Sequence, residues 1–73
     1  MASKGSGAVY KIVDVIGTSP TSWEDAARNA VKTASKSLRD LRIAEVGKLD
    51  VKLEDGKVTA FRARLSLSFK YSA

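Results

Sequence analysis

The stretch that decides the fold runs from Phe61 to Tyr71 and reads FRARLSLSFKY. Every odd-numbered position in it is apolar and every even-numbered position is polar or charged. Successive side chains of a strand point to opposite faces, so this alternation predicts a long β-strand with one buried and one wet face. A chain of 73 residues offers little surface to cover such a strand. We therefore expect an assembly and not a monomeric enzyme.

Two further strands are predicted before it. Residues 9–16 are rich in β-branched side chains and end at Gly17, and their apolar residues fall on both faces, which is typical of a strand covered on both sides. Residues 43–53 predict the second strand. One face would carry Ile43, Leu49, Val51 and Leu53, and the other Ala44, Val46, Lys48, Asp50 and Lys52.

The turn between the second and third strands is marked by Asp55 and Gly56. A two-residue loop would place Leu49 opposite Arg62. A three-residue loop that includes Glu54 would place Leu49 opposite Phe61 and keep both apolar faces together. We therefore expect a three-residue turn with a left-handed Gly56, or a bulge just after the turn.

A helix is predicted between the first two strands, ending at about Leu38. It begins either with Ser19 as N-cap before Pro20, or with a capping box from Thr21 to Glu24. Its apolar stripe has helical spacing and is mostly alanine: Trp23, Ala26, Ala27, Ala30, Val31, Ala34 and Leu38. Such a helix can sit close to a sheet but covers only one face of it. The chain is thus predicted to be an α+β protein with the order β-α-β-β, forming one domain over residues 9–73 after a flexible tail over residues 1–8.

Composition excludes several functions. The chain has no cysteine and no histidine, so it has no disulfides, no thiolate metal site and no histidine base. We expect no enzyme, and any metal should be a hard cation bound by oxygens. The net charge of +5 is spread along the chain, and with no aromatic residues on the basic strand face we expect no nucleic-acid partner. Without a long apolar segment we expect no membrane partner and a cytoplasmic protein.

These elements resemble the dodecin family over residues 9–71. The resemblance rests on YKIVDVIGTSP at 10–20, the Asp55-Gly56-Lys57 turn and SFK at 68–70. It implies a subunit whose antiparallel three-stranded sheet wraps one helix, and a homododecamer that forms a hollow shell. Many dodecins bind a flavin between a Trp on the second strand and a Gln on the third. By this resemblance, the corresponding residues here are Ile43 and Arg62.

Both positions depart from the flavin-binding pattern. Isoleucine has no π face for stacking, and arginine cannot accept a hydrogen bond from the flavin ring. A branch described as calcium dodecins shares these departures and the helix start TSPTSWE, found here at 18–24. The resemblance therefore implies a non-enzymatic protein that binds or stores a small ligand or ion. Calcium is favoured, and flavin (FMN or riboflavin) is the alternative.

Candidate site residues follow from this reading. Small-ligand candidates are Ile43, Glu45, Arg62 and Arg64, and metal candidates are Glu45 and Asp50. Calcium takes six to eight oxygens, so a symmetric interface would have to gather carboxylates from several copies. The alternative for these acids is ordinary surface ion pairing with lysines.

Three other features have two interpretations each. Trp23 is either a hydrophobic anchor of the helix or a stacking platform for a flavin. Asp14 interrupts an apolar face and is either paired across a subunit contact or a ligand. The hydroxyl groups around the helix start either cap the helix or bind an anion.

Overall fold

The computed structural model describes residues 8–70 and contains one helix packed on a three-stranded sheet. The elements are β1 (Tyr10–Ser19), α1 (Trp23–Ala34), β2 (Leu41–Glu54) and β3 (Lys57–Lys70). The predicted α+β fold with the order β-α-β-β is confirmed. The predicted tail, apart from residue 8, and the predicted end of the third strand at Tyr71 lie outside the described residues.

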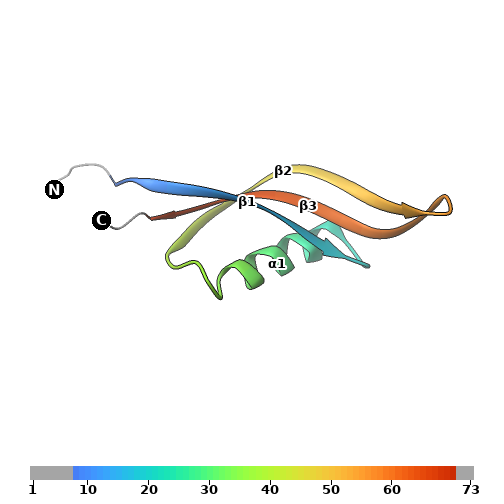
Figure 1. Ribbon diagram of the computed structural model, residues 1–73, viewed down its shortest axis with the longest axis horizontal. Coiled ribbons are helices and arrows are strands. Elements are labelled where there is room, and N and C mark those ends of the chain that lie inside the picture. The colour runs from blue at the N-terminus through green and yellow to red at the C-terminus, as the bar shows by residue number, and fades with distance from the viewer. Residues whose placement is uncertain (1–7, 71–73) are drawn as a thin grey trace.

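The third strand lies in the middle of the sheet, whose strand order is β1-β3-β2. β1 and β2 each pair antiparallel with β3. The two outer strands therefore run parallel to each other without being neighbours. α1 lies along one side of the sheet (Figure 1). We call that side the helix face and the opposite side the outer face.

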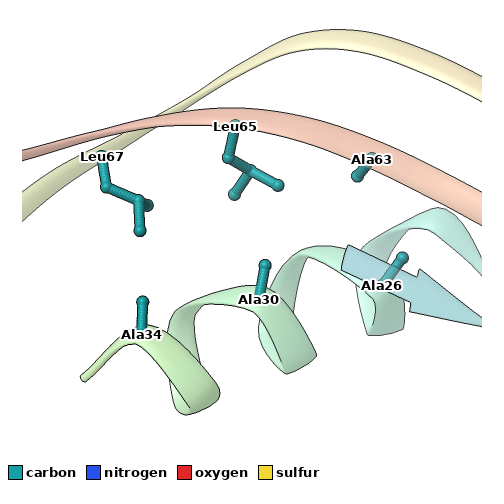
Figure 2. Packing of buried hydrophobic residues seen from close by; sticks show 6 residues of the cluster. All are labelled: Ala26, Ala30, Ala34, Ala63, Leu65 and Leu67. Atoms are coloured by element: carbon teal, nitrogen blue, oxygen red, sulfur yellow. The ribbon is translucent and has the colours of Figure 1, made fainter. Parts of the chain in front are cut away.

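The alternation of β3 is confirmed by its burial. Ala63, Leu65 and Leu67 are 0–1% exposed and point toward α1 (Figure 2). Three alanines spaced one turn apart on α1 face them: Ala26, Ala30 and Ala34. The core is therefore thin, because the buried residues that the helix contributes are all alanines.

Gly17 of β1 sets how closely the helix approaches the sheet. A Cβ atom at this position would lie 2.0 Å from the main-chain oxygen of Ala26 and 2.8 Å from Cβ of Ala30. No side chain fits there, so glycine and the alanine stripe together allow the close packing of α1 on β1.

Both predicted starts of the helix are wrong, because Ser22 is the N-cap. Its side chain accepts a hydrogen bond of 3.0 Å from the main-chain N–H of Asp25. Ser19 is instead the buried last residue of β1, where its hydroxyl accepts from the N–H of Thr21 and donates to the Asp25 carboxylate at 2.7 Å. The Ser22 hydroxyl thus caps the helix, which confirms the self-capping interpretation. An anion at the helix start would have to compete with the Asp25 carboxylate for the Ser19 hydroxyl.

The helix also ends earlier than predicted. It stops at Ala34, and a turn follows in which the N–H of Leu38 donates to the oxygen of Ala34 at 2.8 Å. Leu38 still packs against the core although it lies beyond the helix, which explains why the sequence pattern included it in the apolar stripe.

The hairpin between β2 and β3 has a two-residue loop. Asp55 and Gly56 both have positive φ, at 51° and 74°, and Glu54 pairs with Lys57. The predicted three-residue turn is therefore wrong. The predicted alternative, a bulge just after the turn, is confirmed: the register shifts past Thr59.

This bulge keeps the two apolar faces of the hairpin together. Val51 pairs with Phe61, and Leu49 pairs with Ala63, which lies two residues beyond the predicted partner Phe61. The extra residue in β3 thus does what the longer turn was expected to do.

A second bulge at Gly47 overturns the predicted faces of the first half of β2. Val46 pairs with Leu65 but Lys48 pairs with Arg64, so Gly47 is left over. Because one extra residue reverses the alternation, Ala44 and Val46 lie on the helix face. Ile43, expected beside Leu49, lies on the outer face.

The helix face of β2 is left uncovered. α1 packs mainly on β1 and β3, and the hairpin projects well past the helix (Figure 1). Val46, Leu49 and Leu53 are consequently 48–59% exposed. No helix among residues 8–70 is long and apolar enough to cross a membrane.

Candidate functional site

The register brings all the predicted site residues to the outer face. Three pairs of β2 and β3 carry most of them: Glu45 with Ser66, Lys48 with Arg64, and Asp50 with Arg62. Ile43 pairs with Ser68 one step further. These residues share a face but form no single pocket, because they are spread over four outward-facing pairs of the β2–β3 ladder.

Asp50 and Arg62 form a bidentate ion pair. Nε of Arg62 lies 2.7 Å from Oδ1 of Asp50, and Nη2 lies 2.9 Å from Oδ2. The hydrogen bond from Arg62 holds the pKa of the Asp50 carboxyl below its ordinary value, and the same contact raises the pKa of Arg62. Desolvation opposes this lowering of the Asp50 pKa but is smaller than the effect of the hydrogen bond, and the charges of Arg62 and Arg64 lower the pKa a little further. Asp50, a predicted metal ligand, is therefore paired with Arg62, a predicted small-ligand residue.

Trp23 lies on the helix face behind this ion pair. Its ring meets Phe61 edge to face, with centroids 5.1 Å apart and planes at 75°. Its indole N–H donates to the main-chain oxygen of Asp50 at 3.0 Å. These contacts confirm the interpretation of Trp23 as an anchor for the start of α1.

A carboxylate stands on each side of Ser66 in the middle of the outer face. Ser66 pairs with Asp14 of β1 on one side and with Glu45 of β2 on the other. The Ser66 hydroxyl donates to Oδ1 of Asp14 at 2.6 Å. Asp14 thus has a partner within its own chain. Ser66 was not among the candidate site residues, although its even position on β3 predicted that it lies on the wet face.

Arg64 borders a hollow at the β1 side of the same face. Asp14, Val15, Ile16 and Arg64 line an open space of about 460 Å³. The structure thereby brings Arg64 near a carboxylate that the list of candidate ligand residues did not include.

A family model described as Dodecin matches residues 9–72 of the chain. The chain belongs to the dodecin family. The calcium dodecin of Mycobacterium tuberculosis is 50% identical over 64 residues, which are 86% of this chain and 89% of that protein. The predicted family and its calcium-dodecin branch are confirmed by this relative.

Solved dodecin structures share the fold. The dodecin of Streptomyces coelicolor matches with a TM-score of 0.87 at 38% identity, over 94% of this chain and 99% of that one. The calcium dodecin of Mycobacterium tuberculosis, described as having a novel calcium-binding site, matches with a TM-score of 0.79 at 47% identity. That match covers 89% of this chain and 93% of the other.

The outer face of this dodecin is also unusually apolar at three exposed positions. Ile12 and Ile43 are each 63% exposed and flank Ser68 from the two outer strands, while Ile16 is 49% exposed beside Arg64. Large exposed apolar side chains gathered on one face are typical of a surface that another molecule covers.

The acidic residues of this dodecin are spread out in the part of the chain that the structure describes. Among residues 8–70, no three acidic side chains lie together in a group that could hold a metal ion. Glu45 and Asp50, the predicted metal ligands, lie at different pairs of the hairpin, and Asp50 is bound by Arg62.

Proposed function

We propose that this dodecin is a non-enzymatic subunit of a homododecameric shell that binds or stores calcium. The observation that carries the proposal is its 50% identity to a protein named calcium dodecin, across most of both chains. Flavin (FMN or riboflavin) is the alternative ligand.

The outer face favours calcium over flavin. Ile43 offers an exposed aliphatic surface, which cannot supply the stacking energy of about 0.5–1.5 kcal/mol that an aromatic ring gives. The Arg62 guanidinium is bound by both oxygens of Asp50, so using it to bind a flavin would first break that pair. Carboxylates at Asp14 and Glu45 are, by contrast, the donors that calcium prefers.

A calcium site on this face would be completed by other copies of the chain. Calcium takes six to eight oxygens, and one copy offers two carboxylates beside Ser66. Glu45 is the first candidate ligand, because it has no ion pair within the described part of the chain. Asp50 is the second, since its carboxylate would have to leave Arg62. Arg64 and Ile43 would line the space around the bound ligand.

Self-association is supported by what one copy leaves uncovered. The outer face exposes three isoleucines and the helix face of β2 exposes valine and leucine side chains. Both outer strands of the sheet also have an edge without a strand partner among residues 8–70. Natural proteins cover such edges, and symmetric assembly covers them with the chain's own surface.

The native mass tests the assembly. We expect about twelve times the 7.8 kDa of one chain by native mass spectrometry. We also expect the thermal midpoint to fall when a chelator removes calcium, because a ligand bound only to the folded state stabilises it. A monomer at micromolar concentration would refute the shell.

A pair of variants tests the calcium ligand. In Glu45→Gln we expect the calcium dissociation constant from calorimetry to rise roughly tenfold or more, because ligand charge sets affinity in such sites. Glu54→Gln is the matched control, since Glu54 lies near the turn and pairs with Lys52 at 3.5 Å. Equal affinities in both variants would exclude Glu45 as a ligand.

Riboflavin fluorescence separates the two ligands. We expect no quenching on addition of the protein, because Ile43, at the position of the stacking ring, has no π face. Saturable quenching with no calcium effect on the melting curve would favour the flavin alternative.

A further inference from the structure

An apolar groove runs between α1 and β2 on the helix face. It has a volume of about 380 Å³. Seven residues line it, and five of them are apolar: Ala27, Val31, Ala44, Val46 and Leu65. Two cationic side chains of α1, Arg28 and Lys32, stand at its rim. The groove exists because α1 barely reaches β2.

The hairpin of the same chain cannot fill this groove. Val46 lines the groove and Leu53 lies seven residues further along the same strand. At about 3.3 Å per strand residue, the hairpin end is roughly 20 Å away, and it points away from the helix (Figure 1). Residues 1–7, MASKGSG, carry a single large apolar side chain and are a poor match for an apolar groove.

The hairpin end has a surface that matches the groove. Leu53 and Val58 pair with each other on its helix face and are 59% and 52% exposed. Asp55 lies in the adjacent turn and has no ion pair within the described residues. Glu54, by contrast, is paired with Lys52. The hairpin end therefore offers two aliphatic side chains next to one available carboxylate.

We propose that the hairpin end of one copy docks into the groove between α1 and β2 of another copy. Leu53 and Val58 would enter the apolar lining, and Asp55 would meet Arg28 and Lys32 at the rim. The inference rests on the self-association proposed above and adds which two surfaces meet.

Charge disfavours a second groove as the occupant, whereas the hairpin end carries both signs, with Glu54 and Asp55 beside Lys52 and Lys57. Two grooves facing each other would bring four cationic side chains together, which is unfavourable. A hairpin end brings an anion to that rim and covers its own exposed leucine in the same contact. Each copy has one groove and one hairpin end, so every copy can give and receive one contact in a closed symmetric assembly.

Engineered cysteines test the contact cleanly, because the chain has none of its own. A tagged Val31→Cys chain is co-expressed with an untagged Leu53→Cys chain, and the purified assembly is oxidised with diamide. We expect a mixed disulfide on a non-reducing gel. Each chain carries one cysteine, so the mixed product can form only between copies.

The matched control uses the other side of the helix. Thr33 lines the cleft between α1 and β1, so Thr33→Cys with Leu53→Cys should give no mixed disulfide. Arg28→Cys with Val58→Cys repeats the positive test at the groove rim, should Val31→Cys fold poorly. Absence of mixed disulfide from both positive pairs, in a protein whose native mass is that of an assembly, overturns the docking while leaving the shell intact. A monomeric native mass would refute the shell and the docking together.

A second measurement tests the charge contact. Asp55→Asn removes the carboxylate and still suits the positive φ of 51°. We expect the rate of mixed-disulfide formation at low salt to fall roughly two- to fivefold, in line with one exposed ion pair. Glu54→Gln removes an equal charge beside the turn and should leave the rate unchanged. Equal rates in the two variants would contradict the placement of Asp55 at the rim.

Discussion

The indole N–H of Trp23 in α1 donates a hydrogen bond of 3.0 Å to the main-chain oxygen of Asp50 in β2. This bond joins the helix to the one strand that it otherwise hardly touches. It lies directly behind the ion pair of Asp50 with Arg62, so the start of the helix and the outer face are connected through a single residue of β2.

Substitution of Trp23 tests this connection. Trp23→Phe keeps a ring near Phe61 but loses the hydrogen bond, and we expect the free energy of unfolding to fall by about 1 kcal/mol. Trp23→Ala also loses the ring contact and should fall further. Urea unfolding at fixed protein concentration measures both. A double-mutant cycle with Phe61→Leu should give a coupling of about 0.5–1.5 kcal/mol, and a coupling near zero would contradict the ring contact.

Gly17→Ala tests the close approach of helix and sheet. The added Cβ would lie 2.0 Å from the main-chain oxygen of Ala26, so the helix must move away from β1. We expect a loss of several kcal/mol, of the order seen for severe overpacking, and largely insoluble protein. In the control Gly47→Ala, the nearest atom is the oxygen of Arg64 at 3.7 Å. Gly47→Ala should therefore remain folded, and similar stability of the two variants would refute the role of Gly17.

Acid should selectively weaken the ion pair of Asp50. Arg62 holds the pKa of the folded carboxyl below the ordinary value of 3.8 that it regains on unfolding. The pair's contribution is therefore fully present above that value and is lost as pH falls through the lower folded pKa. Melting curves from neutral pH down to pH ~3 should fall more steeply for the natural protein than for Asp50→Asn. Arg62→Gln should show the same flatter profile, and parallel curves in all three proteins would argue against the pair.

The turn gives a prediction about backbone conformation. Gly56 has a φ of 74°, and Gly56→Ala should destabilise the protein by about 1 kcal/mol, since a Cβ is disfavoured there. No atom lies within 4 Å of the added Cβ, so the cost comes from the backbone and not from a clash. Asp55→Asn should be close to neutral, because Asn-Gly suits this turn. Thermal melts compare the two, and a neutral Gly56→Ala would mean that the turn relaxes.

The strand periodicity predicted the middle of the fold well. Phe61 to Phe69 alternates without interruption, and its odd positions, from Ala63 to Leu67, form the buried half of the core. The alanine stripe likewise predicted a helix that lies close to the sheet and covers little of it. Both signals are local, so they could be read from the sequence.

The positions of the bulges could not be predicted from the sequence. The bulge at Gly47 reverses the alternation of β2, so the periodicity assigned Ile43 to the wrong face. For the same reason Glu45 and Asp50 share the outer face, although they are five residues apart. A glycine in a strand permits such a bulge but does not require one. The pairing with β3 decides it, and that is a long-range property.

The prediction of the helix start was wrong for a related reason, and the partners of the candidate site residues could not be predicted. Ser19, Thr21 and Ser22 can each cap a helix, and the choice of Ser22 follows from Ser19 being buried beside Asp25. The ion pair of Arg62 with Asp50 follows from the register of the hairpin, which depends on the bulge at Thr59. Residue types predicted at most a hard cation bound by oxygens, and the family resemblance implied calcium or a small ligand, but neither showed which of these side chains already have partners.

The thin core has a consequence for how the protein responds to dilution. Among the described residues, the largest side chains that are fully buried are Leu65, Leu67 and Ser19, and the helix contributes alanines. If neighbouring copies supply the remaining cover, folding and assembly share one equilibrium, and mass action governs both. We expect the thermal midpoint to rise with protein concentration, and a midpoint independent of concentration would show that one copy is self-sufficient. Lowering the concentration would then unfold the chain without changing a single residue.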